Sequence, residues 1–96
     1  MLILITYDVN TTTKAGEKRL RKVAKECINY GQRVQNSVFE CLLTEAQVVN
    51  LKAILSSIID DTADSVRFYF LGSNWQRRIE KIGKETSYNP TEALII

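Results

Sequence analysis

Residues 2–9 read LILITYDV, an apolar run that ends in a tyrosine and an aspartate. Leucine and isoleucine without a polar break are typical of a central strand that is covered on at least one face. The segment has no basic leader and no small-residue cleavage site, so it indicates a strand and not a signal peptide. Residues 10–13 read NTTT, which predicts a turn and offers a hydroxyl side chain as a helix N-cap.

Apolar spacing predicts two helices further along the chain. The first ends before Gly31 and places on one face Leu20, Val23, Ala24, Cys27 and Ile28. The second opens with a capping box, in which Thr44 is the N-cap and Gln47 the third helical residue. Its buried side consists of Val48, Leu51, Ile54, Leu55, Ile58 and Ile59.

The remaining segments predict strands. Residues 32–43 are extended, and Asn36-Ser37 marks either a tight turn between two strands or a bend in one. We favour two strands. Residues 66–71 alternate between apolar and other side chains, which predicts a further strand. The order is that of an α+β, ferredoxin-like βαββαβ fold, with two helices on one face of a four-stranded antiparallel sheet.

A length of 96 residues predicts a single domain. We expect residues 1–72 to form its compact part and residues 73–96 a C-terminal tail. The tail contains a short strand at Ile79–Ile82, which is too isolated to be stable alone and should add to an open sheet edge, including that of a partner protomer. Its apolar end, Leu94-Ile95-Ile96, would then be available to a larger protein.

Composition excludes several classes of mechanism. The chain has no histidine, so catalytic triads with an imidazole base, histidine-based ribonucleases and zinc sites with histidine ligands are excluded. Carboxylates and a bound metal ion remain as catalytic tools. Cys27 and Cys41 are too far apart for a CxxC motif and are expected to be reduced and buried. No apolar run is long enough to span a bilayer, and we expect a cytoplasmic protein without membrane contact.

Charge is distributed unevenly along the chain. Basic residues outnumber acidic ones in residues 1–43, whereas acidic residues prevail in residues 44–71. Residues 60–64 read DDTAD and predict a solvated acidic loop. This uneven charge distribution indicates that one face of the protein binds an anionic partner.

Three groups of polar residues are candidates for a site. Asp8 ends an apolar strand, where a carboxylate is costly unless something binds it; the alternative is an Asx-turn residue. In the first helix, lysines face solvent, whereas Arg19 and Arg21 flank the apolar stripe and could reach a phosphate group. The strand that starts at Arg33 and passes Ser37 either has a solvated polar side or supplies donors to a sugar-phosphate backbone.

Four stretches together resemble the CRISPR-associated protein 2 family, the small dimeric nucleases that accompany the spacer integrase. They read YDV at 7–9, RLR at 19–21, QRVQNSVFE at 32–40 and RFYFLG at 67–72, and the resemblance extends from residue 1 to about 71. It implies that Asp8 is the metal-binding aspartate and faces its symmetry mate across a dimer. It also implies roles in activity for Arg19, Arg21, Arg33 and Phe39, and it places Tyr7 beside the aspartate.

The resemblance implies a homodimeric, metal-dependent endonuclease of DNA or RNA that acts with the integrase in CRISPR spacer acquisition. Two copies of Asp8 would supply oxygen ligands to one Mg²⁺, or Mn²⁺ in its place. Tyr7, Arg33 and Phe39 would complete the catalytic site, and the residues expected to bind nucleic acid are Arg19, Arg21, Arg33, Ser37, Arg77 and Arg78. The alternative is a non-catalytic architectural dimer that holds duplex DNA and bridges integrase subunits. A base-stacking RNA-binding sheet is disfavoured, because Phe68 and Phe70 alternate like core residues.

Overall fold

A computed structural model describes residues 1–71 and 78–84 of the chain. The elements in chain order are β1 (Leu2–Asp8), α1 (Lys14–Ile28), β2 (Gly31–Gln35), β3 (Val38–Leu42), α2 (Glu45–Ile58), β4 (Ser65–Phe70) and β5 (Arg78–Gly83). This order confirms the α+β, ferredoxin-like prediction. The two strands predicted on either side of Asn36-Ser37 are also confirmed, as β2 and β3.

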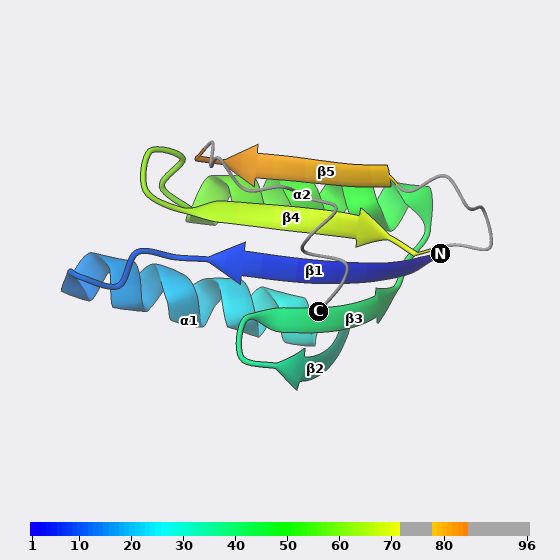
Figure 1. Ribbon diagram of the computed structural model, residues 1–96, viewed down its shortest axis with the longest axis horizontal. Helices are drawn as coiled ribbons and strands as arrows, with labels where there is room; N and C mark the ends of the chain where they lie inside the picture. The colour runs from blue at the N-terminus through cyan, green and yellow to red at the C-terminus, as the bar shows by residue number, and fades with distance from the viewer. Residues whose placement is uncertain (72–77, 85–96) are drawn as a thin grey trace.

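The strands form one antiparallel sheet in the order β2-β3-β1-β4-β5, and both helices cover the same face of it (Figure 1). The central strand β1 pairs with β3 on one side and with β4 on the other, so Ile5 lies opposite both Phe39 and Phe68. These three side chains are fully buried under the helices. We call this side of the sheet the covered face and the opposite side the open face.

The helix α2 begins at the predicted residue, and the N-cap of α1 is the last of the hydroxyl residues in the predicted turn at 10–13. The Thr13 hydroxyl accepts a hydrogen bond from the backbone N–H of Gly16 at the start of α1. Thr44 and Gln47 form the reciprocal capping box of α2. The predicted apolar stripe of α1 is wrong at its last member, because Ile28 is 59% exposed. Ile28 is the final residue of α1, where the helix ends and the chain passes to the edge strand β2.

The predicted short strand in the tail is β5, and it is longer than expected. It pairs with β4 of the same chain, from Ser65 opposite Gly83 to Phe70 opposite Arg78. Its side chains on the covered face meet α2, where Lys52 forms an ion pair with Glu80. The open edge that receives this strand is therefore that of β4 in its own protomer. Arg77, the boundary between residues 72 and 73, and the apolar end at 94–96 lie outside the described residues.

Both cysteines lie in the core, as predicted, and neither forms a disulfide. Burial raises the pKa of Cys27 to about 12 and that of Cys41 to about 11, so both remain thiols at neutral pH. Neither α1 nor α2 is long and apolar enough to cross a membrane.

Candidate metal and nucleic-acid site at the end of β1

Asp8 is the last residue of β1 and lies on the open face. Side chains alternate along a strand, and the buried Ile3, Ile5 and Tyr7 all point to the covered face. Asp8 therefore points the other way, opposite Ser65 of β4, and it is exposed. Within the described residues its carboxylate makes no hydrogen bond or ion pair, which leaves it available to a ligand.

The Asx-turn alternative belongs to Asn10 and not to Asp8. The Asn10 side-chain oxygen accepts hydrogen bonds from the Thr12 backbone N–H at 3.0 Å and from the Thr12 hydroxyl at 2.7 Å. Asn10 thus closes the turn between β1 and α1 without using the carboxylate of Asp8.

A divalent metal ion fits Asp8 as one ligand among several. Mg²⁺ prefers oxygen ligands and is usually held in proteins by one or two carboxylates together with water and substrate phosphates. Across residues 1–71 and 78–84, no three potential ligands of the types His, Cys, Asp and Glu gather in one place. The remaining ligands would have to come from a second copy of Asp8, from water and from phosphate oxygens.

Tyr7 and Phe39, which the sequence places in the catalytic group, lie in the core on the covered face. Their ring centroids are 6.1 Å apart, and Phe39 has no exposed surface. The backbone N–H of Tyr7 donates to the carbonyl oxygen of Ser37 at 3.1 Å. Burial raises the pKa of the Tyr7 hydroxyl, with partial opposition from the Arg33 guanidinium, so Tyr7 is a neutral phenol at pH 7. Both side chains pack in the core on the covered face and do not line the surface that carries Asp8.

Arg33 reaches solvent from the edge strand β2. Its guanidinium carbon lies 5.2 Å from the centroid of the Phe39 ring, a distance at which cation and ring attract each other. The side chain is exposed, so it can meet a phosphate group while its guanidinium lies over the Phe39 ring. Ser37, in the turn after β2, adopts a left-handed backbone conformation with φ of 65°. The strand register places Arg33 on the covered face, opposite to the face of Asp8.

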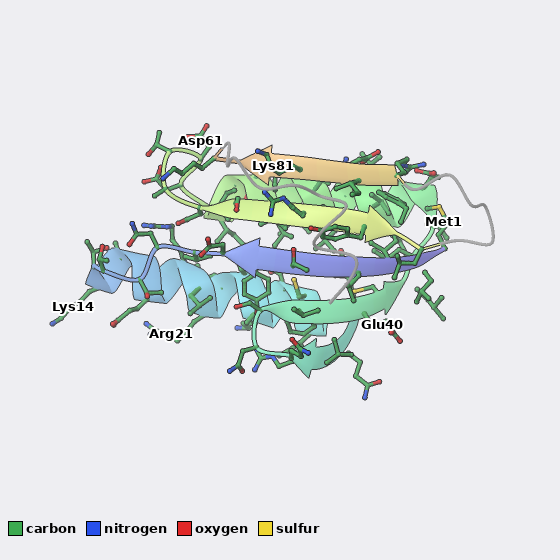
Figure 2. All side chains as sticks on the ribbon, viewed as in Figure 1. Met1, Lys14, Arg21, Glu40, Asp61 and Lys81 are labelled. Carbon is green, nitrogen blue, oxygen red and sulfur yellow. The ribbon has the colours of Figure 1, made fainter. Side chains whose placement is uncertain are left out.

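Arg19 and Arg21 occupy different environments although both flank the stripe of α1. Arg19 Nε donates to Asp64 Oδ2 at 2.7 Å, and the Asp64 side chain is 0% exposed. The predicted solvated loop is therefore wrong at Asp64, which turns inward to meet this arginine, although Asp60 and Asp61 are exposed. Arg21 is exposed and lies on the side of α1 away from β4 (Figure 2).

Burial acts to raise the pKa of Asp64, but hydrogen bonds from Arg19 and from two backbone N–H groups outweigh it. They hold the pKa below the usual value of an aspartate, so Asp64 is ionised at neutral pH. One faint signal for this residue is present in the sequence, its place directly before the alternating strand 66–71. An aspartate within an acidic run otherwise resembles its solvated neighbours.

Arg78, expected to bind nucleic acid, is engaged within the fold. Its guanidinium forms a bidentate ion pair with Glu45 at 3.1 and 3.2 Å and a further ion pair with Glu80 at 2.9 Å. The guanidinium carbon also lies 3.7 Å from the centroid of the Phe70 ring. This network is at the far end of β4 from Ser65, the residue that faces Asp8.

Comparison with known proteins gives the family. The model of the family described as CRISPR associated protein Cas2 matches residues 1–79. The chain belongs to the Cas2 family. A relative from Halalkalibacterium halodurans, named CRISPR-associated endonuclease Cas2, is 55% identical over 95 residues and is covered over 99% of each chain. A relative from Chlorobaculum tepidum, named CRISPR-associated endoribonuclease Cas2, is 55% identical over 96 residues, the whole of both chains.

A solved Cas2 structure has the same fold. The crystal structure of Streptococcus pyogenes Cas2 superposes with a TM-score of 0.72 at 64% identity, over 79% of this chain and 92% of that chain. The two curated names differ in the nuclease they denote, since one says endonuclease and the other endoribonuclease.

Proposed function

We propose that this Cas2 family member is a metal-dependent endonuclease of DNA or RNA in a CRISPR system, and that Asp8 is its metal ligand. The observation that carries the proposal is the position of Asp8, an exposed carboxylate without a partner in the described chain at the end of a buried strand. A carboxylate held there by a rigid strand is suited to a hard cation. The names of the relatives, endonuclease and endoribonuclease, support a nuclease.

The working unit is a homodimer in this proposal. Neither α1 nor α2 covers the open face, and Leu42, which lies there opposite Leu2, is 76% exposed. A second copy packed on this face about a two-fold axis would cover such apolar side chains and would present every residue near the axis twice. Two copies of Asp8 would then hold one Mg²⁺ or Mn²⁺. The bound ion would withdraw charge from the phosphodiester group under attack.

Two exposed arginines orient the nucleic acid in this proposal. Arg21 and Arg33 are exposed and offer fixed guanidinium forks to phosphate oxygens. Phe39 holds Arg33 in place through its ring, and Tyr7 packs beneath them. Contacts of this kind reach only the backbone, so cleavage should show little sequence preference.

Within the cell, we propose that the dimer acts in the cytoplasm together with the CRISPR integrase during spacer acquisition. Family membership supports this context. The segment that the sequence offers for integrase contact, residues 94–96, lies outside the described residues.

The surface of α1 favours a second function, that of an architectural dimer that binds duplex DNA without cutting it. Four lysines on this helix are exposed, Lys14, Lys18, Lys22 and Lys25. They lie on the helical layer, whereas Asp8 lies on the open face of the sheet. A duplex held along α1 is therefore on the other side of the protein layer from the carboxylate.

One panel of cleavage assays tests the nuclease proposal. Wild type, Asp8→Asn and the control Asp61→Asn are incubated with labelled duplex DNA and single-stranded RNA in Mg²⁺, Mn²⁺ or chelator. We expect cleavage by the wild type and the control in metal alone, and a loss of at least about a hundredfold in Asp8→Asn, because the ion loses its protein ligands. Undiminished cleavage by purified Asp8→Asn would refute the role of Asp8. Tight DNA binding without cleavage by any form would favour the architectural function.

A further inference from the structure

The buried carboxylate of Asp64 accepts hydrogen bonds from three separate segments. Oδ1 accepts from the backbone N–H of Asn10 at 2.9 Å, and Oδ2 accepts from the backbone N–H of Asp60 at 2.9 Å. Arg19 spans both oxygens, with Nε 2.7 Å from Oδ2 and Nη2 3.4 Å from Oδ1. One side chain thus joins the turn after β1, the helix α1 and the loop between α2 and β4.

This junction lies beside Asp8. Asn10 follows Asp8 by two residues, and Ser65, the neighbour of Asp64, pairs with Asp8 across the sheet. The Asp64 carboxylate therefore holds the end of β1 from the chain that leaves it and from the strand beside it. Elsewhere along β1, the regular pairing with β3 and β4 holds the strand in place. The pairing with β3 ends at Thr6, before the strand reaches Asp8.

Two glycines show how closely the segments approach each other here. A Cβ atom at Gly16 would come within 1.9 Å of the Asn10 carbonyl oxygen, so only glycine lets α1 start against this turn. A Cβ atom at Gly83, whose φ is 96°, would come within 2.2 Å of the Asp64 carbonyl oxygen. The next residue, Lys84, donates its backbone N–H to that oxygen at 2.7 Å.

The arginine in this junction is unsuited to a phosphate. Its fork is turned to a carboxylate that has no exposed surface, and the pair of charges cancels. Arg21 shares the helix and the charge but has no such partner in the described chain. We propose that Asp64 is a positioning residue for the Asp8 site, and that Arg19 acts through Asp64 and does not bind a phosphate group of the nucleic acid. The positioning role of Asp64 at the Asp8 site rests on the proposed function.

Salt dependence of nucleic-acid binding separates the two arginines. The slope of log K against log salt is negative, and each phosphate contact that is lost reduces its magnitude by about one unit for duplex DNA. We expect Arg21→Gln to reduce the magnitude of the slope by about one and Arg19→Gln to leave it at the wild-type value. The dissociation constant of the full-length protein for a labelled duplex is measured across a salt series at a temperature where both variants are folded. An equal drop in slope for Arg19→Gln would overturn the assignment.

Asp64→Asn, with Asp61→Asn as its matched control, tests the positioning role. Asparagine keeps the shape, but its NH₂ group must face a backbone N–H in either orientation, because each oxygen of Asp64 accepts one. We expect hydrogen exchange at the amide that loses its acceptor, that of Asn10 or that of Asp60, to accelerate about tenfold to a hundredfold, which corresponds to the loss of a hydrogen bond to a charged group. Cleavage should lose kcat at unchanged KM, and the control should match wild type in both measurements.

The outcomes keep the two proposals apart. Faster exchange at either of these two amides with unchanged kcat would make Asp64 merely structural and would overturn the positioning role. Unchanged exchange at both amides would overturn the junction itself. If the wild type does not cleave, the proposed nuclease and the positioning role for its site fail together, while hydrogen exchange still tests the junction and the salt slope still tests the role of Arg19. If Arg19→Gln does not fold, Asp64→Asn decides, because an arginine that binds phosphate would not need Asp64 for kcat.

Discussion

The two faces of the sheet differ in what they carry, and the division runs between neighbouring residues. Tyr7 points to the covered face, where it packs on Phe39 in the core. Asp8, the next residue, points to the open face and is exposed. Strand alternation alone separates them, so one short segment contributes both to the stability of the fold and to its candidate site. A residue next to a catalytic group in sequence can thus lie on the other side of the protein layer.

The Asp64 junction connects these two roles. It is buried like the core, yet it holds the turn that follows Asp8. We therefore expect substitutions to fall into an order of effect on stability, with the core of the covered face first, the junction second and exposed ion pairs last.

The largest effect on stability is expected from Phe39→Ala. Phe39 is fully buried and stacks on Tyr7, and its removal leaves a cavity in the core. The free energy of unfolding should fall by about 3–5 kcal/mol, as measured by urea denaturation. The control Val49→Ala, at an exposed position of α2, should change it by less than about 0.5 kcal/mol. Equal losses in the two variants would contradict the burial of Phe39 in the core under the helices.

An intermediate effect is expected from Asp64→Asn. Breaking the pair leaves the Arg19 charge and a backbone N–H without their acceptor, but the Arg19 side chain, 21% exposed, can still recruit water. The free energy of unfolding at pH 7 should fall by about 2 kcal/mol. Chemical denaturation beside Asp61→Asn measures the difference, and identical midpoints would contradict the junction.

The pH dependence of that loss has a definite sign. Hydrogen bonds hold the pKa of Asp64 in the folded protein below its unfolded value, although burial opposes them. On acidification the unfolded chain is protonated first, so the contribution is complete above the unfolded pKa of about 4 and is lost as the pH falls through the lower folded pKa. The stability difference between wild type and Asp64→Asn should therefore shrink from about pH 6 to about pH 3. A difference that grows on acidification would show a raised pKa instead.

The smallest effect is expected from Glu45→Gln in the network with Arg78. The Glu45 side chain is mostly exposed, and Arg78 keeps Glu80 and the Phe70 ring as partners. Arg78 lowers the pKa of Glu45, but solvent screens this pair. The urea midpoint should match wild type within error. A loss as large as that of Asp64→Asn would mean that this network anchors β5 as firmly as the junction anchors β1.

The fold was predictable because its signals are local. The run at 2–9, the capping box at Thr44 and the alternation at 66–71 each specify an element within a few residues. The position of Asp8 at the end of a strand was predictable for the same reason. Which of the two faces it occupies follows from alternation once the buried residues of β1 are known.

The Arg19–Asp64 pair was not predictable from sequence, because its partners are 45 positions apart and little besides its place before the strand distinguishes Asp64 from Asp61. The orientation of Arg78 toward α2 depends equally on how β5 pairs with β4. Side-chain partners across elements are set by packing in three dimensions, whereas helices and strands are set largely by their own residues.

The stoichiometry of Mn²⁺ binding tests whether two copies of Asp8 share one ion. Calorimetric titration of the full-length wild type, with sedimentation in parallel, should give a dimer that binds one ion for every two chains, and Asp8→Asn should give a dimer that binds none. One ion for each chain, or equal binding by Asp8→Asn, would contradict a shared metal site at the end of β1.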